Sequence, residues 1–194
     1  MTKNLNVKPA SGKLGILTPG MGAVSTTFMA GVIAVRRGLS DPIGSLSEMA
    51  KIRLGKRTEK RSSLVREMVP LAPLEDIVFG GWDIFEENAF ESASRAKVLE
   101  KELLLQIKDE LEKIKPMPAV FDTKFVKLID GPNKKKAASK WDLAQALRED
   151  IRNFKKNNNC ERIVMVWCGS TEAYIQIGQE HLTVDSFEKA LKES

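Results

Sequence analysis

The sequence predicts an α/β fold in which a mainly parallel sheet is doubly wound by helices. Short apolar segments alternate with helical segments along the whole chain, and no internal repeat interrupts this alternation. Because crossovers between parallel strands are usually helical, the alternation indicates a parallel sheet covered on both faces. A composition of 42% hydrophobic and 29% charged residues over 194 residues is typical of one globular domain.

Four short apolar segments are the expected strands. They are residues 13–18, 75–83, 118–121 and 162–168. Right-handed crossovers place successive strands parallel, so their carboxyl ends face the same side of the molecule. We therefore expect one edge of the sheet to carry the strand ends, which follow Thr18, Gly80, Phe121 and Cys168.

The segments between and after the strands predict four helices. They are residues 25–36, 88–115, 139–157 and 185–192. Gly38 is the expected stop of the first helix, Asn88 and Ser139 are the expected caps of the next two, and Pro116 ends the long one. Residues 40–66 show no sustained strand period and predict a loop with one short helix, and the lysine run at 134–136 is expected in solvent.

Composition excludes several classes of function. The net charge of +5 is mild and spread over stretches that also carry acids, which argues against a nucleic-acid partner. Cys160, Cys168 and the single histidine, His181, are too few for a disulfide framework, a zinc site or a histidine-based triad. The first dozen residues have no apolar core and no apolar run reaches membrane-spanning length, so we expect no membrane partner and a reducing cytosolic compartment.

A glycine-rich turn lies between the first strand and the first helix. Gly20, Gly22 and Ser25 have the form G-x-G-x-x-S, one substitution from the dinucleotide-binding fingerprint. Gly20 would make the turn, Gly22 would let the backbone approach a pyrophosphate, and the N–H groups of Val24, Ser25 and Thr26 would point at it. This context predicts a Rossmann-like dinucleotide-binding domain over residues 1–194. The alternative is a tight strand-to-helix turn that binds no ligand.

An acidic residue at the next strand end completes this hypothesis. The fingerprint usually has an acid about 20 residues beyond the glycines, but that interval contains Glu48 only within a segment that is not a strand. Asp83 ends the next strand, so its carboxylate would reach the adenosine ribose hydroxyls and repel a 2′-phosphate. This favours NAD over NADP. The alternative is a turn-forming Asp beside Gly80 and Gly81.

The last strand also ends in small and polar residues. Gly169 permits close approach of a ligand, and the hydroxyls of Ser170 and Thr171 can donate hydrogen bonds. The thiol of Cys168 has no neighbouring base in the sequence, so a packing role is favoured. His181 is expected at the surface, and the basic run 51–66 is expected to be a solvated face that could otherwise meet phosphates.

Several short segments together carry a family resemblance. They are GMGAVSTT at 20–27, GSLS at 44–47, GWDI at 81–84, KPMP at 115–118, KW at 140–141, DIRNFK at 150–155 and VWCGSTE at 166–172. In this order and spacing the chain resembles the inositol-3-phosphate synthases, also called myo-inositol-1-phosphate synthases. The resemblance spans nearly the whole chain, and the GWDI and KPMP segments contribute most to it.

The resemblance implies an NAD-dependent isomerase of inositol and phospholipid biosynthesis. Such an enzyme converts glucose 6-phosphate to inositol phosphate by oxidation at one carbon, an aldol-like ring closure and reduction by the same NADH. It also implies a cytoplasmic homo-oligomer. The residues that the hypothesis assigns to the NAD site are Gly20, Gly22, Ala23, Val24, Ser25, Asp83, Ala119, Val120, Cys168, Gly169, Ser170 and Thr171.

Two departures from the family pattern limit what can be assigned. The glycine loop is one residue shorter and lacks two asparagines, so pyrophosphate contacts would depend on backbone N–H groups. The family's chain is about twice as long, and its catalytic lysines and substrate-phosphate site lie beyond the position of Ser194. We therefore assign no catalytic residue and expect an NAD-binding part that is inactive alone. An NAD-dependent dehydrogenase and a non-enzymatic nucleotide-binding module remain the alternatives.

Overall fold

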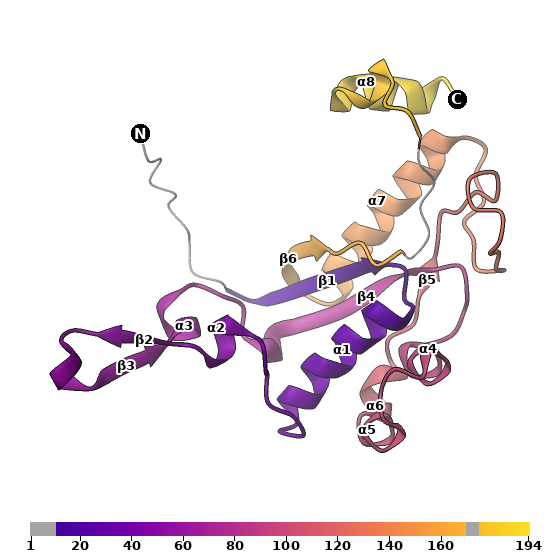
Figure 1. The fold of residues 1–194 in the computed structure, drawn as a ribbon. Helices are drawn as coiled ribbons and strands as arrows, with labels where there is room; N and C mark the ends of the chain where they lie inside the picture. Colours follow the sequence, from indigo (N-terminus) through magenta and orange to yellow (C-terminus); the bar gives the residue numbers. More distant parts are fainter. Residues whose placement is uncertain (1–10, 170–174) are drawn as a thin grey trace.

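A four-stranded parallel sheet forms the centre of the molecule (Figure 1). The structure, a computed structural model, describes residues 11–169 and 175–194. The strands are β1 (Lys13–Pro19), β4 (Ile77–Asp83), β5 (Met117–Pro118) and β6 (Cys160–Met165). Their order across the sheet is β5-β4-β1-β6, and every neighbouring pair is parallel. The predicted α/β fold with a mainly parallel sheet is confirmed.

Helices lie on both faces of this sheet (Figure 1). One face carries α1 (Ala23–Arg36), α4 (Ala89–Ala96), α5 (Lys101–Gln106) and α6 (Lys108–Leu111). The other carries α7 (Lys140–Asn157), and α8 (Val184–Lys192) packs near the start of α7. The described residues also contain three short 3₁₀ turns, at Arg57–Glu59, Leu74–Asp76 and Gln179–His181.

The main hydrophobic core lies between the sheet and the α1 side. Met29 and Ile33 of α1 meet Ile16 of β1 and Phe79 of β4 there, and all four side chains are buried. The predicted stop of α1 is confirmed, since Gly38 has a φ of +67° directly after the last turn. Burial of apolar area on this face is the main source of stability.

On the second face, α7 packs against the sheet through one aromatic ring, which lies over two glycines of the strands. A Cβ built on Gly15 would lie 2.9 Å from the ring of Phe154 of α7, and a Cβ on Gly80 would lie 2.5 Å from it. Glycine is therefore required at both positions for α7 to approach the sheet. None of the residues of α7 is fully buried, so this face is covered less completely than the other.

The long helix predicted over residues 88–115 is wrong, because the segment forms three short helices. Lys97 follows α4 with a φ of +54°, a left-handed conformation that ends the first helix. The apolar repeat still faces the core, since Leu104, Ile107 and Leu111 are buried. The cap at Asn88 is confirmed, because its side chain accepts hydrogen bonds from the N–H groups of Phe90 and Glu91.

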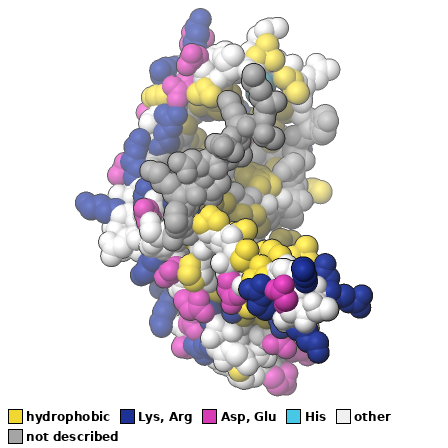
Figure 2. Space-filling model, turned by 90° about the vertical axis from the view of Figure 1, so that its left-hand side faces the viewer, with side chains coloured by type: hydrophobic (Ala, Val, Ile, Leu, Met, Phe, Trp, Pro, Cys, Tyr) yellow, Lys and Arg dark blue, Asp and Glu magenta, His cyan; other side chains and the backbone are white. Residues whose placement is uncertain are grey.

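The loop predicted over residues 40–66 is also wrong, because this segment contains a β-hairpin. Antiparallel β2 (Lys51–Leu54) and β3 (Arg61–Leu64) form it, flanked by two one-turn helices, α2 (Leu46–Met49) and α3 (Val65–Met68). No residue between 39 and 76 is buried. The hairpin projects from the domain, and Figure 2, which faces it, shows Lys and Arg side chains gathered on this projection. The predicted solvated basic face is confirmed.

The strand boundaries differ most from the prediction at β5 and β6. β5 spans only two residues instead of 118–121, and Ala119 continues it through a single parallel bridge to Lys134. β6 is Cys160–Met165 instead of 162–168, although its following residues still bond to β1 through the N–H groups of Val166 and Cys168. Within the described residues no helix is both long and apolar enough to cross a membrane.

Candidate functional site

Gly20 lies at the centre of the carboxyl edge of the sheet, between the ends of β4 and β6. Its N–H donates a 2.8 Å hydrogen bond to the carbonyl of Trp82. Its φ is +87°, and a Cβ there would lie 2.9 Å from the carbonyl oxygen of Cys168. Both the left-handed backbone and the close approach require glycine. The prediction that Gly20 makes the turn is confirmed.

Gly22 and the first turn of α1 present free backbone donors. Gly22 is the N-cap of α1 and supplies no side-chain cap, and a Cβ on it would meet nothing within 4 Å. None of the described residues accepts a hydrogen bond from the N–H groups of Ala23, Val24 or Ser25. Thr26 was predicted to belong to this group, which is wrong, because its N–H donates to the carbonyl of Gly22 at 3.0 Å.

The side chain of Ser25 points into the protein. Its hydroxyl lies 2.8 Å from that of Thr18, and both residues are completely buried. The hydroxyl of Thr18 also donates to the carbonyl of Gly80 at 3.3 Å. A small hydroxyl residue here keeps the start of α1 close to β1, so only the N–H of Ser25 remains open to a ligand.

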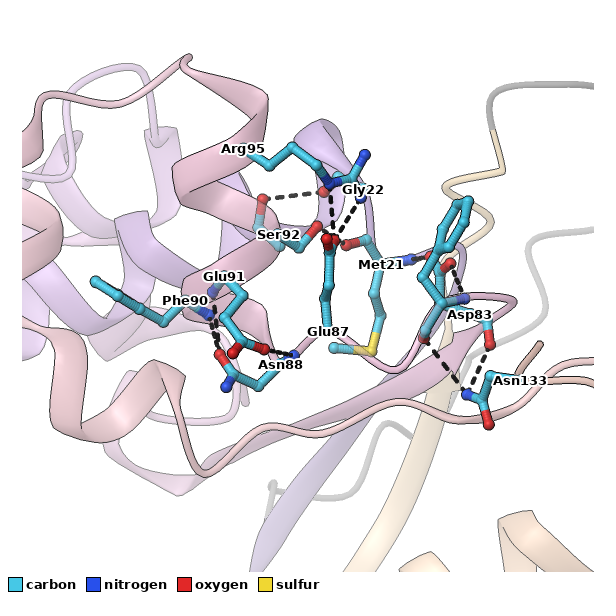
Figure 3. Close-up of polar contacts among 12 residues, drawn as sticks. Met21, Gly22, Asp83, Glu87, Asn88, Phe90, Glu91, Ser92, Arg95 and Asn133 are labelled. Atoms are coloured by element: carbon cyan, nitrogen blue, oxygen red, sulfur yellow. Dashed lines mark hydrogen bonds and ion pairs between the residues drawn. The ribbon is translucent and has the colours of Figure 1, made fainter. Parts of the chain in front are cut away.

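Asp83 is the last residue of β4, and its carboxylate forms a hydrogen bond with the glycine turn (Figure 3). Its Oδ2 accepts a 2.7 Å hydrogen bond from the N–H of Met21, and its Oδ1 accepts a 3.1 Å bond from the N–H of Phe85. The predicted proximity of this carboxylate to the glycine turn is confirmed. The carboxylate is half-buried, and each oxygen keeps a second lone pair for a hydroxyl donor.

Ala119 and Val120 lie at the same edge, one and two residues after the β5 partner of Asp83. Asn133 secures this part of the edge. Its carbonyl accepts from the N–H of Ala119 at 3.0 Å, its own N–H donates to the carbonyl of Ile84 at 2.8 Å, and its side chain donates to the carbonyl of Asp83 at 2.9 Å. Figure 3 shows Asn133 beside Asp83. Val120 is 40% exposed and is open to a ligand.

Cys168 and Gly169 bound the other side of the turn. The N–H of Cys168 donates to the carbonyl of Pro19 at 2.9 Å, and burial raises the pKa of its thiol. A neutral thiol supports the predicted packing role. A Cβ built on Gly169 would lie 2.9 Å from the ring of Trp167, so the two residues are in close contact. Ser170 and Thr171, the remaining predicted site residues, lie outside the described residues, and His181 is exposed as expected.

Sequence reasoning missed four polar residues at this edge, which are Asn133, described above, and Ser92, Asp150 and Lys135. Ser92 of α4 donates its hydroxyl to the carbonyl of Met21 at 2.7 Å, and the carboxylate of Asp150 accepts from the indole of Trp82 at 2.7 Å. Lys135 pairs with that same carboxylate at 2.7 Å. The lysine run was predicted to lie in solvent, which is wrong for Lys135, because its side chain is only 13% exposed.

The edge fits a dinucleotide better than any metal ion. Three features suit a pyrophosphate and a ribose: open space over Gly22, three N–H groups at a helix N-terminus that bond to none of the described residues, and a carboxylate at the neighbouring strand end. No group of three or more potential metal ligands occurs within residues 11–169 and 175–194.

A surface depression of about 620 Å³ lies at the opposite edge of the sheet. Gly12 and Cys160, at the amino ends of β1 and β6, line it together with Arg152 and Lys155. The amino ends of parallel strands do not bear ligand sites in open sheets of this kind. The candidate site is therefore assigned to the carboxyl edge because of its geometry and chemistry, and cavity size plays no part in this choice.

Comparisons with known proteins identify the family to which this chain belongs. A family model described as myo-inositol-1-phosphate synthase, which represents its NAD-binding domain, matches residues 14–194. Inositol-3-phosphate synthase 1 of Bacteroides thetaiotaomicron is 50% identical over 189 residues, which cover 97% of this chain and 43% of that protein. A probable inositol 3-phosphate synthase isozyme 3 of Arabidopsis thaliana is 34% identical over 85% of this chain and 35% of that protein.

A solved structure has the same fold. The inositol-3-phosphate synthase of Caenorhabditis elegans superposes with a TM-score of 0.84 and 25% identity, covering 96% of this chain and 40% of that one. The chain thus spans less than half the length of the relatives it matches. NAD is the cofactor of the domain family that the matched model describes. With the model covering residues 14–194, the chain belongs to the myo-inositol-1-phosphate synthase family.

Proposed function

We propose that this chain is the NAD-binding part of an enzyme that converts D-glucose 6-phosphate to 1D-myo-inositol 3-phosphate. The observation that carries the proposal is the open glycine turn at Gly22, which adjoins the Asp83 carboxylate in a chain of the synthase family. NAD would supply reversible oxidation at one carbon of the sugar phosphate, so the net reaction is an isomerisation.

The chain's own residues would bind and orient the dinucleotide. The N–H groups of Ala23, Val24 and Ser25 would hold the pyrophosphate, since the helix N-terminus attracts anions. Asp83 would accept hydrogen bonds from the adenosine ribose, and its charge would disfavour a 2′-phosphate. Ala119, Val120, Cys168 and Gly169, with Ser170 and Thr171, would border the groove on its two sides.

Gly22 offers a test that separates binding from folding. A Cβ there meets nothing within 4 Å and the backbone is extended, with φ of −83° and ψ of −153°, so Gly22→Val is expected to fold. Its side chain would fill the space that a pyrophosphate needs. Calorimetry is expected to show NAD binding by the unsubstituted chain and at least tenfold weaker binding by Gly22→Val, about 1.4 kcal/mol.

Gly31 provides the matched control. It lies on α1, is exposed, and a Cβ on it also meets nothing within 4 Å. Gly31→Val introduces the same side chain two turns away from the glycine turn and is expected to bind NAD as the unsubstituted chain does. Equal affinity of Gly22→Val and Gly31→Val for NAD, or an unsubstituted chain that binds no NAD, would contradict the proposal.

The proposal extends to the setting of the complete enzyme. We infer a cytoplasmic homo-oligomer acting in inositol and phospholipid biosynthesis, with no nucleic-acid or membrane partner. Family membership supports the biosynthetic role, and two free cysteines are consistent with a reducing compartment. Fractionation of cells and light scattering of the purified enzyme test these two inferences.

A further inference from the structure

One carboxylate on α7, that of Asp150, is connected to two separate parts of the carboxyl edge. Its Oδ2 accepts a hydrogen bond from the indole Nε1 of Trp82 and pairs with Nζ of Lys135, each at 2.7 Å. The side chains of Lys135 and Asp150 are only 13% and 20% exposed, and Trp82 is buried. Charged groups so far from solvent depend on their partners, so loss of one partner leaves another unsatisfied.

The first connection leads to the glycine turn. Trp82 is the residue whose carbonyl accepts the N–H of Gly20, at 2.8 Å. The indole and the carbonyl belong to the same residue of β4, so the bond to Asp150 fixes the side-chain position of the residue that holds the turn. A sheet residue held at both its backbone and its side chain has little freedom to shift.

The second connection leads to the other side of the groove. The N–H of Lys135 donates to the carbonyl of Ala119 at 2.8 Å, while the N–H of Ala119 donates to the carbonyl of Asn133. Asn133 in turn donates to the carbonyls of Ile84 and Asp83. Residues 133–135 therefore tie the end of β4 to Ala119, and the ion pair with Asp150 anchors this segment to α7.

We infer that Asp150 is a positioning residue for the cofactor groove. It holds the glycine turn through Trp82 and the Ala119 side through Lys135, and it has no need to touch the cofactor itself. This inference rests on the proposed function, because the groove is the one that the proposed function assigns to NAD. The structural part of the inference, the anchoring of two segments, stands apart from any ligand.

The test compares the unsubstituted chain with Asp150→Asn. The amide still accepts a hydrogen bond from Trp82, but it no longer neutralises the ammonium of Lys135, whose side chain is only 13% exposed. Without NAD, amide hydrogen exchange is expected to become at least tenfold faster in residues 117–120, where Pro118 has no amide hydrogen, and in residues 133–135, with little change in the buried strand β1. With NAD, the dissociation constant is expected to rise about tenfold, the scale of one lost charge-assisted hydrogen bond.

Glu149→Gln is the matched control, because Glu149 neighbours Asp150 and its pair with Arg152 is exposed. It is expected to change neither exchange nor affinity. The double variant Asp150→Asn with Lys135→Gln replaces the ion pair by two neutral amides, and it is expected to be no weaker in NAD binding than Asp150→Asn alone. Such non-additivity is the signature of two residues acting through one contact.

The outcomes separate this inference from the proposed function. An unsubstituted chain that binds no NAD would contradict the proposed function, while the exchange experiment would still test the anchoring. The inference would be overturned if Asp150→Asn left the exchange of residues 117–120 and 133–135 unchanged. It would also be overturned if exchange in β1 accelerated by the same factor. If Asp150→Asn does not fold, Lys135→Gln, which keeps the bond between Asp150 and Trp82, is expected to accelerate the same two segments, and unchanged exchange in it would overturn the inference.

Discussion

The backbone N–H of Met21 donates a 2.7 Å hydrogen bond to the carboxylate of Asp83, joining the glycine turn to the end of the neighbouring strand. The carboxylate predicted to bind ribose therefore has a structural contact as well. Charge-assisted bonds of this kind are about twice as strong as neutral ones. The turn and the acid consequently form one unit, and a change to either alters the other.

Replacement of Asp83 by Asn tests the role of this charge in cofactor choice. The substitution replaces one of the two carboxylate acceptor oxygens by an amide donor, and it removes the charge that would repel a 2′-phosphate. We expect NAD affinity to fall about tenfold, the scale of one charge-assisted bond, and NADP affinity to fall less. Calorimetry with both nucleotides measures this, with Asp122→Asn, at an exposed loop carboxylate, as the control. Equal losses for both nucleotides would show that Asp83 acts only on the turn.

Gly20→Ala is expected to destabilise the protein more than Gly38→Ala. Both glycines have positive φ values, +87° and +67°, so both alanine variants incur left-handed backbone strain of about 1 kcal/mol. Only at Gly20 does the new Cβ meet backbone, 2.9 Å from the Cys168 carbonyl oxygen. We expect the free energy of unfolding in urea to fall by about 1–3 kcal/mol more for Gly20→Ala. A difference near zero would contradict the close packing of Cys168, which follows β6, against the turn.

Ser25→Ala separates the hydroxyl of this residue from its backbone N–H. The hydroxyl bonds to Thr18 inside the protein, so its loss is expected to reduce the free energy of unfolding by about 1 kcal/mol. The N–H that we assign to the pyrophosphate is unchanged. NAD affinity measured by calorimetry is therefore expected to stay within about twofold of that of the unsubstituted chain. A twofold change corresponds to about 0.4 kcal/mol, the size usual for a substitution that removes no contact with the ligand. A tenfold loss would place the hydroxyl in the binding site instead.

The chain alone is expected to form no inositol phosphate from glucose 6-phosphate and NAD. The family resemblance assigns the catalytic lysines and the substrate-phosphate site to positions beyond Ser194, and catalysis needs such groups held together around the substrate. Phosphate-resolved chromatography of the reaction mixture measures the product. Inositol phosphate from the purified chain would overturn this assignment, and NADH absorbance that grows with time would favour the dehydrogenase alternative.

The fold and the glycine turn could be predicted because both depend on local sequence. Alternating apolar and helical segments specify a parallel α/β sheet, and Gly20 and Gly22 between a strand and a helix specify the turn. The breaks within residues 88–115 could not be predicted, because Lys97 adopts a left-handed conformation with no glycine or proline to mark it. The spacing of apolar residues there correctly predicts which side chains are buried, but it does not predict whether the helix is continuous.

The parts of the site that the sequence did not predict depend on contacts between residues far apart in the chain. Asn133 and Lys135 belong to a segment whose Gly, Pro and Lys composition is typical of a surface loop. Their positions follow from bonds to β4 and to Asp150, which no local pattern encodes. The hairpin was missed for a related reason, since its short strands are mostly polar and have no buried face that would give a period of two.

The absence of any buried residue between 39 and 76 makes the stability of this domain uneven. Opening of the hairpin exposes no core side chain, so its free energy is set by one short ladder and a few surface ion pairs. The sheet can keep its fold while this segment opens and closes. A protease that cleaves after basic residues would therefore cut first between Lys51 and Arg66, and the two fragments would remain associated through the pairing of β1 with β4.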